Sequence, residues 1–209
     1  MKSNRLIISA ILLFLFCGSA LGQRPEITLT LNEQFMDAAL DAVLQKGEPP
    51  SIPLKNDSNA ACRESLRLTR EVGGVRTAVR FRDGRIFAPI AFNGNYSLPI
   101  IGCIDFSGWA ETEITLEFDP AGKRILARAK TLNVNLNGAG AVGGNLLTRL
   151  VRSSVEDRIN PIDLISLERL SFVFPIQGAG NVQLNATGFR HSVQNSSLSI
   201  HIPYEIVRN

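Results

Sequence analysis

The sequence predicts an α+β fold in which a highly curved antiparallel β-sheet wraps around one or two long amphipathic helices. Two segments, 33–45 and 145–160, carry apolar residues at helical spacing over more than half of the helix circumference. The segments between and after them alternate apolar and polar residues, which is typical of strands with one buried face. A helix on a flat sheet needs a narrower apolar stripe, so the wide arcs indicate helices that are enclosed on more than one side.

The first residues predict a secretory signal. A positively charged start and an apolar run at 6–16 precede Ala20, Leu21 and Gly22, which have the small-x-small pattern of a cleavage site. We expect the mature chain to begin at Gln23 and to be periplasmic or secreted. At this length it can form a single α+β domain over residues 23–209.

The charge balance does not indicate a nucleic-acid partner. The whole chain holds 22 Lys+Arg and 19 Asp+Glu. Residues 1–22 contribute Lys2 and Arg5 and no acidic residue, so the mature chain has 20 basic against 19 acidic side chains, a net charge of +1. The basic pI of the whole chain therefore carries no argument for nucleic-acid binding.

Two cysteines remain in the mature chain, Cys62 and Cys103. An even pair in an exported chain predicts a disulfide bond. A metal site or a catalytic nucleophile would need partner residues at a suitable spacing, and neither cysteine has a histidine nearby. The disulfide is therefore the interpretation that we adopt.

The first predicted helix, 33–45, follows a short strand at 27–31. Asn32 can act as its N-cap, because an asparagine side chain accepts a hydrogen bond from the first turn. The wide apolar arc is first of all that of a core helix. Three of its apolar residues are also candidates to line an apolar cavity: Phe35, Met36 and Leu40.

Residues 75–92 predict a β-hairpin. Alternating apolar residues run up to Asp83 and Gly84, a strong signal for a two-residue turn, and resume on the return strand. Pro89 on the return strand favours an edge position, because proline cannot donate a backbone hydrogen bond.

The hairpin region is rich in arginine. Seven arginines lie in residues 63–85, and acidic neighbours make a solvated, charge-balanced face the simpler interpretation. The alternative is a patch that meets anionic lipid headgroups at a membrane surface. The residues that would form this patch are Arg76, Arg80, Arg82 and Arg85.

Two further strands are predicted at 109–118 and 124–136. Glu111, Glu113 and Glu117 share one face of the first strand, where cross-strand pairing with Arg or Lys explains them more simply than catalysis does. In the second strand, the apolar phase of residues 132–136 falls upstream on basic residues. A β-bulge near residue 130 would restore the alternation and bend the strand.

The central helix, 145–160, opens after a glycine run and ends at Pro161, which cannot continue a helix. Alternating strands follow it, at 170–176, 182–186 and 198–204. Gly138, Gly140 and Gly143 form a G-x-G-x-x-G pattern before this helix. We expect no dinucleotide site here, because the preceding strand is too polar and the neighbouring segments are hairpins.

The sequence holds no catalytic signature. The two histidines, His191 and His201, have no Cys, Asp or second His placed to complete a metal site or a triad, and His201 is expected on a polar strand face. No serine lies in a nucleophile-elbow sequence. We therefore expect a protein that is not an enzyme and that uses no cofactor and no metal.

Three stretches carry a resemblance to a known family: ITLTLNEQFMDAALDAVLQ, then KRILARAKTLNVNLNG followed by GGNLLTRLVRSSVEDRINPI, then LSFVFPIQGAGNVQLNATGFRHSVQNSSLSIHIPYEI. Their order of elements resembles the tubular lipid-binding superfamily, which includes the bactericidal permeability-increasing and lipid-transfer proteins, SMP domains and small bacterial exported proteins. The resemblance implies a long helix wrapped by a curved antiparallel sheet, with an apolar groove for acyl chains and no catalytic residues.

The resulting hypothesis is an exported protein that binds or transfers a lipid or another apolar ligand, with the acyl chain held between helix and curved sheet. The expected lining residues are Phe35, Met36, Leu40, Leu147, Leu150, Val151 and Val155. The alternative is a structural or interaction protein of the cell envelope, whose helices fill the sheet and leave no room for a ligand.

Overall fold

The computed structural model describes residues 25–46, 48–54, 62–98, 101–137, 140–177 and 180–208. The expected signal sequence with its cleavage site after Gly22 lies outside these residues, as does Gly138. Among the helices that the structure describes, none has the length and apolar character needed to cross a membrane.

The larger of two sheets has seven strands within the described residues. The order is β10-β9-β8-β7-β3-β2, β6 also pairs with β7, and every pairing is antiparallel. The strands of this sheet are β2 (Ser51–Pro53), β3 (Ser65–Thr69), β6 (Arg80–Arg82), β7 (Arg85–Leu98), β8 (Gly102–Asp119), β9 (Arg124–Asn137) and β10 (Ile162–Ser166). A separate hairpin joins β4 (Glu71–Val72) to β5 (Val75–Arg76).

The smaller sheet has five strands in the described part of the chain, in the order β1-β14-β12-β11, with β13 also paired to β14. All of these pairs are antiparallel. The strands are β1 (Glu26–Asn32), β11 (Phe172–Ile176), β12 (Gly180–Ala186), β13 (Arg190–Gln194) and β14 (Ser197–Arg208). A short 3-10 helix, η2 (Leu167–Leu170), leads into β11.

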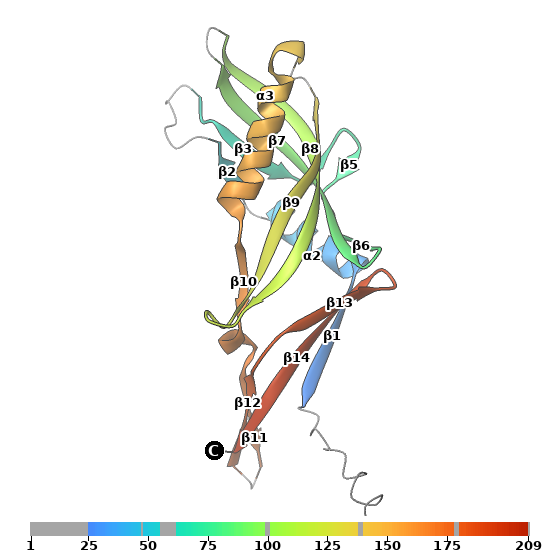
Figure 1. Cartoon of the computed structure of the whole chain (residues 1–209), viewed down its shortest axis with the longest axis vertical. Coiled ribbons are helices and arrows are strands. Elements are labelled where there is room, and N and C mark those ends of the chain that lie inside the picture. Colours follow the sequence, from blue (N-terminus) through green and yellow to red (C-terminus); the bar gives the residue numbers. More distant parts are fainter. Residues whose placement is uncertain are drawn as a thin grey trace, which may run out of the picture.

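The two sheets lie end to end along the long axis of the molecule (Figure 1). Where they meet, Phe81 and Ile86 of the larger sheet pack in one cluster with Leu198 of the smaller sheet. The apolar face of β14 therefore begins inside the protein core and continues away from it.

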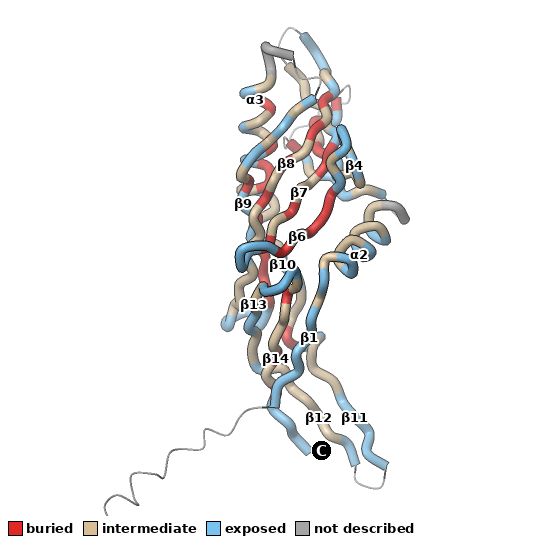
Figure 2. The backbone as a smooth tube through the Cα atoms, turned by 90° about the vertical axis from the view of Figure 1, so that its right-hand side faces the viewer, coloured by how far each residue is buried: buried red, intermediate tan, exposed pale blue. Residues whose placement is uncertain are grey.

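The expectation of one sheet wrapped around long helices is wrong. The helices α2 (Glu33–Lys46) and α3 (Gly140–Ser153) have 14 residues each, and strands make up most of the described chain. Figure 2 shows α3 and α2 apart, with β7 and β8 between them. The protein is predominantly β, because long antiparallel strands build two separate sheets. Each helix packs against strands on one side only.

Helix α3 is buried along a narrow stripe. Leu147 and Val151 are fully buried, whereas Leu146 at the margin of the apolar arc is 44% exposed. The chain continues from α3 into a π-helix, η1 (Ser154–Ile159), and so ends just before Pro161 as predicted. The side chain of Asn160 then accepts a hydrogen bond from the Ala129 N–H and donates one to the Ala129 carbonyl, which ties the helix end to β9.

The glycine run does not form a dinucleotide loop in the described residues. Helix α3 already begins at Gly140, five residues earlier than the predicted start at residue 145. The preceding strand, β9, pairs antiparallel with both of its neighbours. A dinucleotide site needs a parallel β-α-β unit, so this part of the fold does not provide one.

Helix α2 begins as the sequence predicts. The Phe35 N–H donates a hydrogen bond of 2.8 Å to Oδ1 of Asn32, which confirms the N-cap. Glu33 accepts a 2.8 Å hydrogen bond from the Phe81 N–H with its carboxylate. Among the described strands β6 pairs only with β7, so this contact satisfies a backbone group on the free edge of β6.

The predicted turn and bulge are both present. Asp83 and Gly84 have φ angles of 53° and 71°, as a two-residue hairpin turn requires. In β9, Leu132 is the extra residue between the pairs Glu111–Asn133 and Thr112–Thr131. The buried phase changes there from odd to even positions, which confirms the bulge predicted near residue 130.

Pro89 departs from its predicted edge position. It lies inside β7, where it pairs with Glu111 of β8. On its other side the chain between β5 and β6 is irregular, and the Ala78 N–H donates a hydrogen bond to the Pro89 carbonyl at 3.1 Å. Proline is tolerated there because no regular strand on that side needs an N–H from it.

Candidate ligand-binding surface

The seven residues expected to line a cavity lie in two places. Those on the central helix pack against the larger sheet, where Leu147 and Val151 are 0% exposed. Met36 and Leu40 pack at the junction of the two sheets, and Phe35 is 57% exposed. The two groups belong to different clusters and share no common space, so their role as ligand contacts stays a prediction. The remaining members of the first group are Leu150, which is partly buried, and Val155, which is buried.

The smaller sheet has an apolar face that sequence analysis did not single out. Across β1 and β14, Ile27 lies opposite Ile202 and Leu29 lies opposite Ile200. The same face continues over the other pairs of the sheet. These are Leu184 with Ile206, Ala186 with Tyr204, Phe172 with Leu184, and Phe174 with Val182. One face of this sheet is therefore apolar from β1 to β11.

This apolar face is buried along most of β14 and exposed on the strands beside it and at the end of β14. Leu198, Ile202 and Tyr204 are 5%, 6% and 4% exposed, whereas Leu29, Phe174 and Ile206 are 49%, 52% and 54% exposed. The short helix η2 lies against this sheet at Tyr204, whose hydroxyl bonds to Leu170, and Ile206 beyond it is exposed. A contiguous set of exposed large apolar side chains often marks an interaction site.

Aromatic side chains rigidify the far end of the face. The ring of Phe172 contacts those of Phe174 and Tyr204 edge-on, with centroids 4.9 Å and 5.6 Å away. The Tyr204 hydroxyl donates a hydrogen bond of 2.9 Å to the Leu170 carbonyl. Burial raises the pKa of the Tyr204 hydroxyl above its ordinary value.

A hollow of about 520 Å³ borders the same end of β14. Tyr204 and Ile206 line it from the apolar face, and Pro25, Thr187 and Glu205 complete the lining. The hollow lies where β1 no longer accompanies β14, since the last contact between them is the hydrogen bond from the Tyr204 N–H to the Pro25 carbonyl. Apolar surface and polar groups thus meet at its rim.

The opposite face of the smaller sheet is polar where β1, β13 and β14 meet, whereas Val173 and Val207 are exposed on the same face further along the sheet. Glu26 accepts hydrogen bonds from Arg190 and lies 3.0 Å from Nδ1 of His201. The side chain of Thr28 lies 3.1 Å from the same histidine nitrogen. His201 therefore points to the polar face, as its place between apolar neighbours predicted.

The four arginines considered for membrane contact are all paired with carboxylates. Arg80 lies 3.1 Å from Asp37, and Arg76 lies 3.5 Å from Asp41. The other two pairs cross the sheet: Arg82 with Glu111 at 3.1 Å and Arg85 with Glu113 at 3.7 Å. These contacts favour the charge-balanced face, and they account for the glutamates of β8 as cross-strand partners.

Cys62 and Cys103 form a disulfide bond, as predicted, with their Cα atoms 5.7 Å apart. The bond links the segment before β3 to the start of β8, and β7 lies between these two strands. A structural disulfide of this kind is typical of proteins in oxidising compartments.

Comparison with known proteins gives a fold likeness only. No protein-family model matches the sequence, and no curated protein matches it. Among solved structures, the chain is similar to a crystal structure of lipopolysaccharide binding protein, with a TM-score of 0.44 and 13% sequence identity. The match covers 88% of this chain and 51% of that one, so this chain spans about half of its length.

Proposed function

We propose that this protein binds an amphipathic lipid through its acyl chains, which lie on the open apolar face of the smaller sheet. The exposed apolar side chains of this face on β1, β11 and the end of β14, which include Leu29, Phe174 and Ile206, support this proposal most directly. The site differs from the helix–sheet interior that the sequence suggested, because Leu147 and Val151 fill that interior.

The dimensions of the face suit an acyl chain. Its apolar positions on β14 run from Leu198 to Ile206, about 26 Å at the rise of a β-strand, and of these Leu198, Ile202 and Tyr204 are buried whereas Ile206 is exposed. One lipid chain extends over half of a bilayer core, or about 15 Å. Each methylene that leaves water on this face contributes about 0.8 kcal/mol at full burial. Polar groups at the rim of the neighbouring hollow are available to a lipid headgroup.

In this proposal, the protein is an exported carrier without catalytic activity. The Cys62–Cys103 disulfide supports an oxidising compartment, which is periplasmic or extracellular. The proposed lipid binding depends on burial of apolar surface and requires no catalytic side chain. The paired arginines are not part of this proposal, since each already has a carboxylate partner.

The test compares two adjacent residues on opposite faces of β14. Ile206 lies on the apolar face opposite Leu184, whereas Val207 lies on the other face of the sheet, opposite Gln183. Ile206→Ser is expected to weaken binding of a fluorescent fatty acid about fivefold, since roughly 1 kcal/mol of apolar burial is lost. Val207→Ser, the matched control, is expected to bind as the unmodified protein does.

Native mass spectrometry of the purified protein provides the second measurement, in which co-purified lipid is expected. An empty protein that does not bind the fluorescent fatty acid would contradict the proposal. Equal loss of binding in Ile206→Ser and Val207→Ser would contradict the assigned face.

The alternative of an envelope interaction protein retains one supporting observation. Leu147 and Val151 of α3 are fully buried in the core cluster of the larger sheet, which favours a filled interior at this place. This alternative predicts that the protein is purified without lipid and that Ile206→Ser weakens capture of a protein partner.

A further inference from the structure

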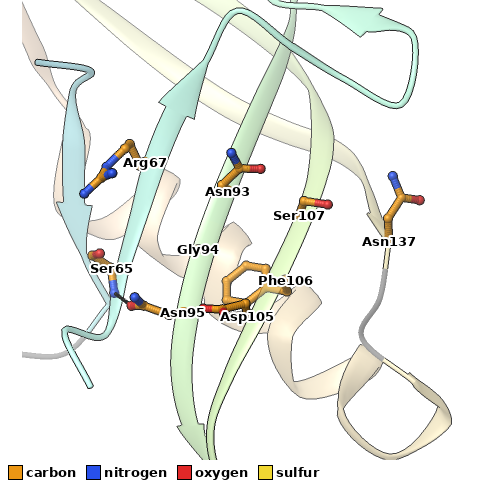
Figure 3. A pocket seen from close by; sticks show the side chains of 9 residues that line it. All are labelled: Ser65, Arg67, Asn93, Gly94, Asn95, Asp105, Phe106, Ser107 and Asn137. Carbon is orange, nitrogen blue, oxygen red and sulfur yellow. Dashed lines mark hydrogen bonds between the residues drawn. The ribbon is translucent and has the colours of Figure 1, made fainter. Parts of the chain in front are cut away.

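The larger sheet carries an open groove of about 620 Å³ on the side away from α3 (Figure 3). Side chains of β3, β7, β8 and β9 project into it. The residues that line it are Ser65, Arg67, Asn93, Gly94, Asn95, Asp105, Phe106, Ser107 and Asn137. Seven of these nine have a polar side chain, so this groove differs in chemistry from the apolar face of the smaller sheet.

Strand register places the polar side chains in two parallel rows. In the first row, Asn95 lies opposite Ser65 on one side and Asp105 on the other. The second row is one step further along the same face. It contains Arg67, Asn93, Ser107 and Asn137, each opposite the next across neighbouring strands. The groove is thus a flat grid of amide, hydroxyl and charged groups on four strands.

The two charged side chains of this grid form no ion pairs within the described part of the chain. Neither Arg67 nor Asp105 forms an ion pair among the described residues, in contrast to Arg76, Arg80 and Arg82 nearby in sequence. Oδ1 of Asn95 accepts a hydrogen bond of 3.2 Å from the Ser65 N–H. This contact orients the amide and leaves its two N–H donors for another partner.

Close backbone contacts define the floor and one end of the groove. A Cβ atom on Gly94 would lie 2.5 Å from Cζ of Phe106, whose ring packs beneath the groove in the core cluster that includes Leu147 of α3. A Cβ atom on Gly73 would lie 3.1 Å from Nδ2 of Asn137, which places the β4–β5 turn at the end of the second row. These contacts hold the grid in a fixed shape.

We propose that this groove binds a neutral carbohydrate. Sugar hydroxyls both donate and accept hydrogen bonds, and the planar amide, carboxylate and guanidinium groups of the grid offer donors and acceptors side by side. An apolar ligand would leave these groups without partners, which is costly. An anion would meet Arg67 but also Asp105, so the charges favour a ligand without net charge.

Ligand binding in the groove can be measured through the fluorescence of Trp109. It is the sole tryptophan of the chain and lies two residues after Ser107 on the same face of β8. Its fluorescence is expected to change in a saturable way when the full-length protein is titrated with chitohexaose or maltohexaose. Inorganic phosphate is the comparison ligand, and it is expected to leave the fluorescence unchanged.

Two asparagines of β9 form a matched pair of variants. Asn137 lines the groove, whereas Asn133 is exposed on the same strand face but lies beyond the groove, opposite Glu111. Asn137→Leu and Asn93→Leu are each expected to weaken oligosaccharide binding about tenfold, as the loss of a hydrogen-bonded contact predicts. Asn133→Leu is expected to bind as the unmodified protein does.

The following results would overturn the inference: no saturable response to either oligosaccharide, unchanged binding in both groove variants, or equal loss in Asn133→Leu. A response to phosphate that Arg67→Gln abolishes, with none to sugar, would identify an anion site and equally overturn it. Folding of each variant is checked by its thermal midpoint. None of these results depends on whether the smaller sheet binds lipid.

Discussion

Two glycines show how a single methyl group can act in opposite directions in this chain. Gly94 lies on β7 under the ring of Phe106, and an added Cβ would come within 2.5 Å of Cζ and 2.9 Å of the Ser65 carbonyl oxygen. Gly144 lies in α3, where an added Cβ meets nothing within 4 Å. The sequence alone does not show this difference, because the space around each Cα depends on tertiary contacts.

We predict that Gly94→Ala destabilises the protein by about 1–3 kcal/mol, because the new methyl group overpacks a closed contact. Gly144→Ala is the control, and it is expected to stabilise by about 0.5–1 kcal/mol through its effect on helix propensity. Urea unfolding midpoints measure both changes. A neutral Gly94→Ala would show that the Phe106 ring moves freely at this position.

At the scale of elements, β1 is attached to the smaller sheet by backbone pairing with β14 and by a carboxylate at its first residue. Glu26 contacts Arg190 of β13 and His201 of β14, so one side chain connects three strands. The hydrogen bond from Arg190 is the main reason that the pKa of Glu26 lies below its ordinary value of 4.5. His201 lowers it further.

This pKa shift predicts an acid-dependent loss of stability. A carboxylate with a lowered pKa in the folded state stabilises the fold above its ordinary pKa, and this contribution disappears as pH falls through the lowered pKa. Glu26→Gln is therefore expected to reduce the thermal midpoint at about pH 7, and the difference from the unmodified protein is expected to shrink as the pH falls below the ordinary pKa of 4.5.

The control for this pH experiment is Glu48→Gln, which removes an exposed carboxylate elsewhere on the chain. Its thermal midpoint is expected to follow that of the unmodified protein over the same pH range. A constant difference between Glu26→Gln and the unmodified protein at all pH values would contradict the role assigned to the charge of Glu26.

The residue pattern of the two helices predicts their ends correctly but not the extent to which they are enclosed. The N-cap Asn32 and the stop at Pro161 are local signals, and both helix boundaries follow them. The width of the apolar arc on α3 did not translate into enclosure, because Leu146 remains 44% exposed while Leu147 is buried. A single apolar side chain at the margin of a helix can face solvent, because the free-energy cost of exposing one such residue is small.

At the scale of the whole molecule, the Cys62–Cys103 disulfide constrains the larger sheet across β7. The two cysteines are separated by 41 positions in the sequence. On the chain-entropy model, a loop of this length stabilises the folded state by about 4 kcal/mol relative to an open unfolded chain. This is a large part of the stability of a typical domain.

We predict that the Cys62→Ala, Cys103→Ala double variant unfolds with a free energy lower by about 4 kcal/mol, as measured by urea denaturation. The unmodified protein in reducing agent is expected to show a similar loss, whereas the double variant is expected to be insensitive to reducing agent. Equal stability of the two proteins under oxidising conditions would contradict this constraint.

The two proposed binding surfaces also belong to the whole molecule, because each is assembled from strands far apart in the sequence. The apolar face joins β1 at the start of the described chain to β14 at its end. The polar groove joins β3 to β9 through β7 and β8. Alternation in each strand predicts two faces, but only strand pairing determines which strands share them.

The sequence by itself determined the local features of this protein: the Asp83–Gly84 turn, the bulge in β9, the N-cap of α2 and the pairing of the two cysteines. Each depends on backbone preference or on chemistry between few residues. The tertiary structure decided that the strands form two sheets end to end, that Leu147 and Val151 lie in a filled core, and that the apolar face at Ile206 stays open. The physical reason is that periodicity specifies which side chains share a face, whereas the neighbour that covers this face depends on contacts between distant segments.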